Sequence, residues 1–123
     1  MLKKPKDYYK GMEIAAARGT HEAVAKMVKK YCRRDCTVLE LGAYTGAMIE
    51  RLRDTGYSLI TAADLDNHLL ISNVPHIQCD FNTDFASNFN MQRFDCIIAS
   101  EVIEHLNSNS RKRFKASPGV VLG

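Results

Sequence analysis

The sequence predicts an α/β fold with an open, doubly wound parallel sheet, and three observations support this prediction. Short apolar runs of strand-forming residues alternate with helix-forming segments in units of about 20 residues, the pattern of parallel β-α-β crossovers. A turn that bears glycines joins the first of these strands to a helix. Acidic residues stand at the ends of successive strands, and open parallel sheets bind their ligands at that edge.

Length and composition fit one small domain. The chain has 123 residues, of which 46% are hydrophobic and 25% charged, which excludes wholesale disorder, a collagen-like fibre and a disulfide-rich miniprotein. No apolar run approaches the ~20 residues of a membrane-spanning helix, and no apolar segment follows the charged N-terminus. We therefore expect a cytoplasmic protein without a membrane partner.

The first elements come from the N-terminal part of the chain. Residues 1–11 are polar and predict a loose arm, and the composition of residues 13–18 favours a short helix that Gly19 interrupts. Thr20 is a candidate cap for a second helix, because its hydroxyl can accept a first-turn backbone N–H. One face of that helix carries apolar residues: Ala23, Val24, Met27, Val28 and Tyr31.

The alternating units of the predicted sheet follow this helix. Strands are predicted over residues 37–41, 58–63, 76–79 and 94–99, and helices over residues 47–55, 66–72 and 83–90. Residues 120–122 have the composition of a fifth strand. Parallel crossovers are right-handed, so the strands are expected to form one sheet with their carboxyl ends at a common edge.

Polar residues at the strand ends indicate a nucleoside ligand. Glu40 closes the first strand, and Gly42 and Gly46 flank a turn where a ligand can lie against the backbone without meeting a Cβ atom. The helix that follows offers unpaired N–H groups and a partial positive charge. Asp64 ends the next strand, where an acid can accept both hydroxyls of a ribose, and Asp80 is placed to receive an adenine amino group.

Several segments resemble a known family in the same order along the chain. They read E-L-G-A-Y-T-G, A-A-D-L-D, Q-C-D-F and F-D-C-I-I-A-S-E-V-I-E-H-L, and R-G-T-H-E-A-V-A precedes them. They resemble the motifs of class I S-adenosylmethionine-dependent methyltransferases of bacterial type, and the resemblance covers residues 20–106. It implies a Rossmann-like fold, S-adenosyl-L-methionine as cofactor and methyl transfer to an acceptor that the sequence does not identify.

The resemblance also implies which residues bind the cofactor. They are Glu40, Gly42, Ala43, Gly46, Asp64, Leu65, Cys79, Asp80, Phe81, Ala99 and Ser100. The glycine turn would lie beside the methionine part, Asp64 would hold the ribose hydroxyls, and Asp80 would bind the adenine amino group. Tyr44 departs from the family, which usually has glycine there. If this position needs a positive φ, tyrosine costs about 1 kcal/mol or more, unless a side chain turned towards solvent is tolerated.

The segment E-V-I-E-H allows two interpretations. In a helix, Glu101, Glu104 and His105 would share one face and could hold Mg²⁺ or Mn²⁺, as in small-RNA 3′-end 2′-O-methyltransferases. That family needs a further histidine downstream, and none follows His105. We therefore favour a site without metal, in which Glu101 and His105 are the candidate catalytic residues, and keep the metal site as the alternative.

The C-terminal part suggests a sheet that stops early. We divide the chain into an N-terminal arm with a short helix (1–19), the cofactor-binding domain (20–106) and a basic tail with the stub of a fifth strand (107–123). About four or five of the usual seven strands are expected, so the domain looks truncated after the fourth.

An early stop would have two consequences. An open edge at the fourth strand would favour self-association. A cofactor-binding pseudoenzyme or fragment without an acceptor site would then be the alternative to an enzyme. Residues 1–10 carry a net charge of +3, residues 107–123 carry +4, and those between carry −4. Nucleic acid is therefore an open partner class but not the favoured one.

Overall fold

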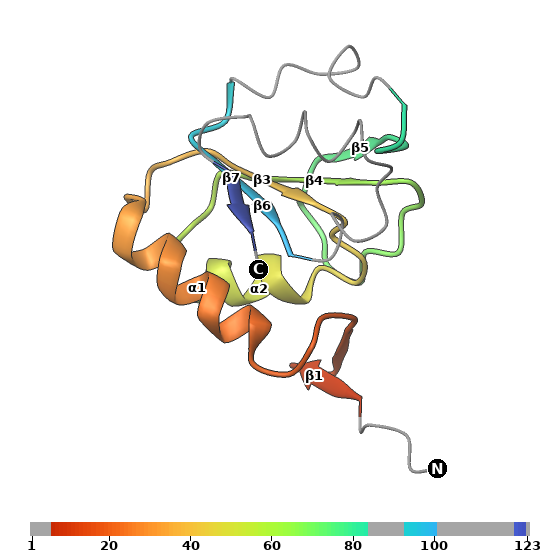
Figure 1. Cartoon of the computed structure of the whole chain (residues 1–123), viewed down its shortest axis with the longest axis horizontal. Coiled ribbons are helices and arrows are strands. Elements are labelled where there is room, and N and C mark those ends of the chain that lie inside the picture. The colour runs from red at the N-terminus through yellow and green to blue at the C-terminus, as the bar shows by residue number, and fades with distance from the viewer. Residues whose placement is uncertain (1–5, 84–92, 101–119, 123) are drawn as a thin grey trace.

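The computed structural model describes residues 6–83, 93–100 and 120–122 (Figure 1). Its elements are β1 (Asp7–Tyr9), β2 (Met12–Ile14), α1 (Thr20–Tyr31), β3 (Val38–Leu41), α2 (Ala47–Asp54), β4 (Ile60–Asp64), β5 (His76–Gln78), β6 (Cys96–Ala99) and β7 (Val120–Leu122). Every strand predicted from residue 37 onward is present, with ends that differ by at most about two residues, the usual uncertainty of such boundaries. None of the described helices is long and apolar enough to cross a membrane.

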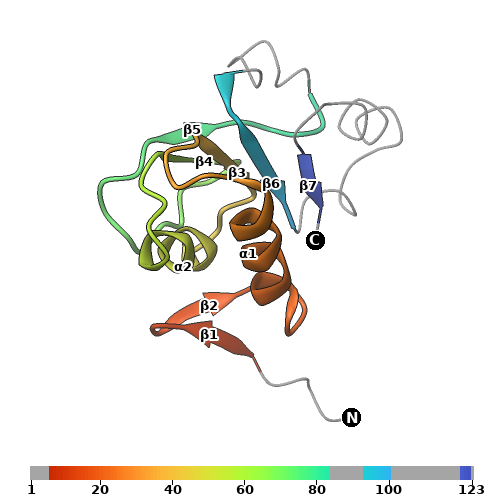
Figure 2. The same cartoon turned by 90° about the vertical axis from the view of Figure 1, so that its left-hand side faces the viewer.

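The main sheet confirms the predicted fold class. Its five strands run in the order β5-β4-β3-β6-β7, and every neighbouring pair is parallel (Figure 2). The chain builds outward from β3 through β4 to β5, and then returns to the other side of β3 with β6 and β7. The strand order therefore reverses between β3 and β6, and ligands of such sheets bind outside the carboxyl ends of the strands at this reversal.

The expected open edge at residues 94–99 is not found. β7 pairs in parallel with β6 along the register Ile97↔Val120, Ile98↔Val121 and Ala99↔Leu122. β6 is thus an inner strand, paired on one side with β3 and on the other with β7. The predicted fifth strand is confirmed, and self-association through a sheet edge stays a prediction.

The apolar core lies on both faces of this sheet. Figures 1 and 2 show α1 and α2 on the same side, and their buried side chains pack with those of alternate strand positions. That cluster includes Val24, Val28, Val38, Met48, Ile49, Leu52, Tyr57, Ala62 and Ile98. The other strand positions form a second cluster with Leu39, Leu41, Ala63, Ile97 and Ala99. Strands buried on both faces explain why β3 and β6 are apolar almost throughout.

The N-terminal prediction was wrong, because a hairpin replaces both the loose arm and the short helix. β1 and β2 pair antiparallel, and Lys10 and Gly11 form the turn with positive φ values of 48° and 82°. Met12 and Ile14 are buried in a small cluster with Ala47 of α2. Lys10 Nζ also lies 2.7 Å from the carboxylate of Asp54. These tertiary contacts override the local helix preference of residues 13–18.

The start of α1 also differs from the prediction. Gly19, with φ 88°, is the N-cap, and no side chain hydrogen-bonds to the first turn. Thr20 is therefore the first helical residue and does not cap the helix as expected.

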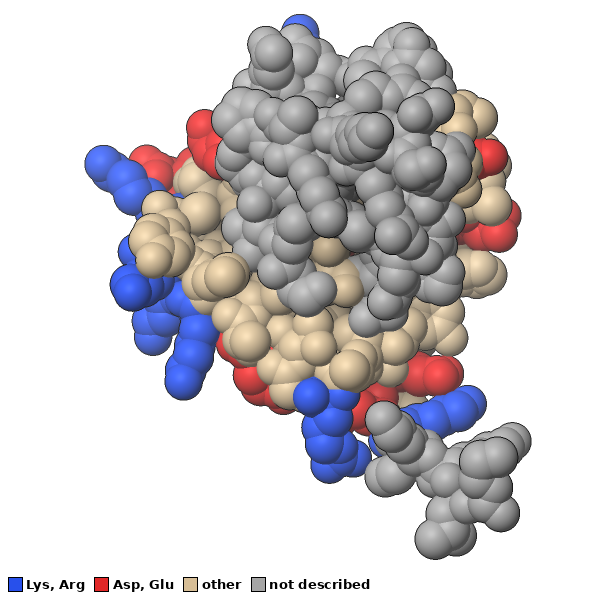
Figure 3. Space-filling view, in the orientation of Figure 1, with Lys and Arg blue, Asp and Glu red and all other residues tan. Residues whose placement is uncertain are grey.

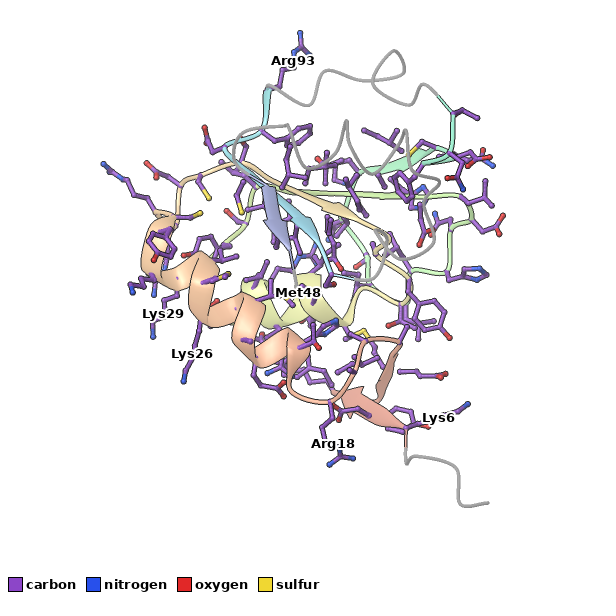
Figure 4. The ribbon with its side chains drawn as sticks, viewed as in Figure 1. Lys6, Arg18, Lys26, Lys29, Met48 and Arg93 are labelled. Carbon is purple, nitrogen blue, oxygen red and sulfur yellow. The ribbon has the colours of Figure 1, made fainter. Side chains whose placement is uncertain are left out.

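A basic surface follows the exposed side of α1. Lys26, Lys29 and Lys30 project from the C-terminal part of the helix, and Figure 3 shows Lys and Arg side chains gathered over it. Figure 4 shows Lys26 and Lys29 pointing away from the sheet, whereas Met48 lies between α2 and the sheet. Within the described ranges, no ion pair of 4.0 Å or less involves these three lysines. Nucleic acid stays an open but not favoured partner class, as expected from the charge of the two ends of the chain.

The helix predicted over residues 66–72 is absent. The segment after β4 is an irregular loop whose backbone groups bond elsewhere: Leu70 N–H donates to the carbonyl of Thr45 (2.9 Å), and Arg53 donates to the carbonyls of Ser72 (2.8 Å) and Asn73 (2.9 Å). The Leu70 N–H, which a helix would pair internally, is thus satisfied by the turn before α2. The helix predicted over residues 83–90 lies almost entirely outside the described residues.

We expect Gly46→Ala to lower the free energy of unfolding by about 2 kcal/mol. Gly46 has φ +89°, and an added Cβ would lie 2.8 Å from Ile71 Cδ1 and 3.2 Å from Leu69 Cδ2. Gly19→Ala is the matched control, because Gly19 has φ +88° but nothing within 4 Å of an added Cβ. Urea unfolding of both variants separates the backbone cost from the packing cost, and equal losses would contradict the packing of this loop over Gly46.

Candidate functional site

The carboxyl ends of β3, β4 and β6 bring the predicted site residues together. Glu40 in β3 is aligned with Ala62 in β4 and Ile98 in β6, so the residues that follow these three reach the same edge of the sheet. Gly42 N–H extends the ladder by donating to the carbonyl of Ala63 (2.8 Å). Gly42, Asp64 and Ser100 therefore stand at the point where the strand order reverses.

Glu40 is the most deeply buried acid of this edge. Its relative exposure is 2%, and its Oε2 atom has no hydrogen-bond partner among the described residues. Burial, followed by the negative charge of Asp64, raises the pKa of the Glu40 carboxyl well above its usual value. A buried acid without a partner is costly, so this side chain is a candidate to meet a ligand.

Asp64 is held in place by the backbone around it. One carboxylate oxygen accepts the Tyr44 N–H (3.0 Å), and the other accepts the Leu65 N–H (2.8 Å). These bonds fix the orientation of the carboxylate and leave further lone pairs for a ligand. Leu65, which is 52% exposed, offers an apolar surface directly beside it.

Tyr44 has the strained backbone that the sequence analysis identified as costly. Its φ is 51°, a left-handed conformation that favours glycine. Its side chain is half-buried and does not simply point into solvent, because the hydroxyl donates to the Glu13 carboxylate (3.3 Å) and the ring meets His68 edge-on. The hydrogen bond from Tyr44 N–H to Asp64 and these two contacts offset the strain and explain how tyrosine is tolerated.

The glycine turn has a second role that its sequence did not indicate. Gly42 and Gly46 both have positive φ values, 74° and 89°. The space that a side chain would need at Gly46 is filled by Ile71 and Leu69 of the loop after β4. Gly46 therefore lets this loop approach the turn, and a ligand does not reach it from that side.

The residues that were expected to bind the adenine follow β5. Cys79 is buried, and burial raises the pKa of its thiol to about 11, so it stays a neutral apolar group. Its N–H donates to the carbonyl of Asp64 (3.0 Å), which places Asp80 one residue beyond this bond. Asp80 is exposed, and its carboxylate accepts the Asn82 N–H (2.9 Å). Phe81 is half-buried and packs against the core cluster of Leu39 and Cys79.

The substrate-side residues are only partly described. Ala99 and Ser100 end β6 as buried residues, with exposures of 2% and 9%. The candidate catalytic residues Glu101 and His105, and Glu104 of the alternative metal site, lie outside the described residues. In the described ranges, no group of three His, Cys, Asp or Glu residues could hold a metal ion.

His21 is a further residue of this site, and no motif in the sequence indicated it. It is 8% exposed, and its Nδ1 atom has no hydrogen-bond partner among the described residues. Burial, and then the positive charge of Arg51, lowers the pKa of the imidazole to about 4. His21 continues the buried stripe of Val24 and Val28 at helical spacing, and this periodicity was the signal that could have revealed its burial.

A narrow pocket joins His21 to the glycine turn. Its lining combines residues 13–16 of the hairpin and the connection to α1 with His21, Glu40, Gly42, Ala43, Tyr44, Thr45, Ala47 and Ser100. The cavity volume is about 10 Å³, which corresponds to about one water molecule. A larger ligand therefore requires residues of this lining to move.

The family assignment rests on the sequence as well as on this geometry. The family model of a methyltransferase domain matches residues 11–116, which is most of the chain. The chain belongs to the methyltransferase domain family. The resemblance to methyltransferases is thereby confirmed, and the family match includes the β2 strand and the hairpin connection that border the pocket of this methyltransferase domain.

Two solved structures share the fold of this methyltransferase domain. The sugar N-methyltransferase KedS8 from Streptoalloteichus sp ATCC 53650 has a TM-score of 0.57 and 16% identity, over 99% of this chain and 57% of that chain. The putative hemolysin from Lactococcus lactis has a TM-score of 0.51 and 20% identity, over 71% and 46% of the two chains. The chain thus spans about half the length of each structure. None of the curated proteins matches the sequence.

Proposed function

We propose that this chain is an S-adenosyl-L-methionine-dependent methyltransferase whose described part binds the cofactor. The observation that carries the proposal is the pair of acids at the reversal of strand order. Asp64 is an oriented carboxylate beside an exposed apolar residue, and Glu40 is a buried acid without a partner next to the glycine turn. This pair fits a ligand with a ribose at one end and a cationic group at the other.

The residues of the site fit the two halves of this cofactor. Asp64 can accept the ribose hydroxyls, Leu65 can pack against the adenine, and Asp80 can accept from its amino group. Glu40 has an unpaired carboxyl oxygen for the ammonium of the methionine part. The bound cofactor supplies the activated methyl group, so the chain has to bind, orient and exclude water around the sulfonium.

The residues that would contact the methyl acceptor are also part of this proposal. Glu101 follows Ser100 directly and His105 stands four residues further on. Both are expected to border the acceptor, where either could take up a proton if the acceptor must lose one. Binding of an acceptor, and the choice among nitrogen, oxygen and carbon, would depend on residues beyond the described site. The acceptor therefore stays an open part of the proposal.

Calorimetric titration with S-adenosylhomocysteine, the demethylated cofactor, tests the proposal. The parent chain is expected to bind, and Asp64→Ala to bind at least about tenfold more weakly, because it loses charge-assisted hydrogen bonds to the ribose. Asp66→Ala is the matched control, since Asp66 is exposed two residues further along and no ion pair of 4.0 Å or less includes it within the described ranges. Its affinity should stay within about twofold of the parent's.

Two outcomes would count against the proposal. If the parent chain does not bind S-adenosylhomocysteine, cofactor use is contradicted. If it binds, but no acceptor class is methylated in the presence of the cofactor, the chain acts as a cofactor-binding module and not as an enzyme.

A further inference from the structure

Two buried polar atoms without partners face one pocket. His21 Nδ1 comes from the first turn of α1, and Glu40 Oε2 comes from β3. Both side chains line the same narrow pocket, although their residues are 19 positions apart in the sequence. Buried polar groups nearly always have a partner, and unpaired ones require an explanation. A ligand with two polar groups would satisfy both atoms at once.

The two ends of the pocket have opposite electrostatic character. At the His21 end, the positive charge of Arg51 of α2 has a larger effect on the imidazole than the negative charge of either Glu22 or Asp7. Glu13, which also lines the pocket, is paired with Lys6 (3.4 Å), and no side chain caps the start of α1 at Gly19. At the Glu40 end, Asp64 contributes negative charge. The His21 end therefore suits an anionic group, and the Glu40 end suits a cationic group.

We propose that His21 binds the carboxylate of the cofactor's amino-acid group while Glu40 binds its ammonium. This assignment rests on the proposed function and adds to it a residue on α1. The imidazole donates its Nδ1–H to the carboxylate, and Glu40 accepts from the ammonium. The cavity holds only about one water molecule, so residues of its lining must move to admit the amino-acid group.

Binding of two ligands that share a nucleoside shows whether His21 contacts the cofactor or only stabilises the fold. S-adenosylhomocysteine carries the amino-acid group, and 5′-methylthioadenosine has the same adenine, ribose and sulfur without it. For His21→Leu, calorimetry should show at least about tenfold weaker binding of S-adenosylhomocysteine, whereas 5′-methylthioadenosine should change less than about twofold. Asp64→Ala should weaken both ligands, because the ribose is common to them.

Two conservative variants keep the test decisive if His21→Leu does not fold. Asparagine places its amide nitrogen close to the position of Nδ1, and glutamine places it further out, towards Nε2. His21→Asn should therefore retain most of the affinity for S-adenosylhomocysteine, and His21→Gln should lose it. Thermal unfolding of each variant verifies that the binding measurements are made on folded protein.

The outcomes distinguish failure of this inference from failure of the proposed function. Equal weakening of both ligands in His21→Leu, or no change in either, would overturn the role of His21. A parent chain that binds 5′-methylthioadenosine as tightly as S-adenosylhomocysteine would also overturn it, while cofactor binding itself would stand. A parent chain that binds neither ligand would overturn the proposed function and this inference together.

Discussion

His21→Gln should make the folded state less sensitive to acid. Burial lowers the pKa of His21 from 6.5 to about 4, so the unfolded chain takes up a proton that the folded chain refuses. The stability contributed by the neutral imidazole is complete above pH 6.5 and is lost as the pH falls from 6.5 towards 4. The loss amounts to about 3 kcal/mol when the shift is converted at ~1.4 kcal/mol per unit.

Urea unfolding at pH 7.5 and pH 4 measures this effect. The difference in unfolding free energy between the parent and His21→Gln should shift by about 3 kcal/mol between the two pH values, in favour of the variant at low pH. His68→Gln is the control for the substitution itself, because His68 is exposed in the loop after β4 whereas His21 is buried. A constant difference for His21→Gln would show that the folded protein takes up the proton as readily as the unfolded chain.

Periodicity and the order of elements were enough to predict the sheet. The strand-forming runs at β3, β4, β5 and β6 are short and bounded by turn residues, and residues 120–122 pair where the fifth strand was expected. Glu40, Gly42, Asp64 and Ser100 meet at one edge because parallel strands with these connections must align their carboxyl ends. For these strands, the local sequence pattern and the topology both predict the same parallel sheet.

The N-terminal segment shows what local pattern could not predict. Residues 13–18 have helix-forming composition, yet Met12 and Ile14 are buried against Ala47, and Lys10 pairs with Asp54 at the far end of α2. These partners are more than 30 residues away in the sequence, so no local window contains the reason for the hairpin. The pocket wall formed by residues 13–16 was missed for the same reason.

The helix prediction for residues 66–72 was wrong for a different reason. Their composition permits a helix, but two backbone groups of the loop bond to distant groups: Leu70 N–H donates to the carbonyl of Thr45, and the carbonyl of Ser72 accepts from Arg53. The absence of a side chain at Gly46 makes this docking feasible. A glycine interpreted only as a ligand-binding feature was therefore also a packing feature, and sequence alone does not separate these two uses.

Glu40→Gln should have an effect of opposite sign to that of His21→Gln. Burial and Asp64 raise the pKa of Glu40 well above 4.5, so the folded chain holds a proton that the unfolded chain releases. The folded state is then favoured at low pH and loses stability as the pH rises above 4.5, by up to about 1.4 kcal/mol per pH unit until the folded pKa is reached. Glutamine mimics the protonated acid and removes this dependence.

Between pH 4.5 and pH 6.5, the two residues therefore act against each other. In this window, stability should rise with pH in Glu40→Gln, where only His21 remains, and fall with pH in His21→Gln, where only Glu40 remains. The double variant should be nearly flat. Unfolding free energies at four or five pH values give these slopes, and the same slope in Glu40→Gln as in the parent would contradict the raised pKa.

Unfolding free energies measured against pH in the presence of ligand test whether the buried acid Glu40 binds the cofactor's ammonium. An ammonium bound to Glu40 would favour the ionised carboxylate and offset the loss of stability at higher pH. Saturating S-adenosylhomocysteine should therefore reduce the loss of stability that the parent shows as the pH rises, and leave the pH dependence of Glu40→Gln unchanged. An equal change in both proteins would mean that the ligand's ammonium does not meet Glu40, and the buried acid would then need another explanation.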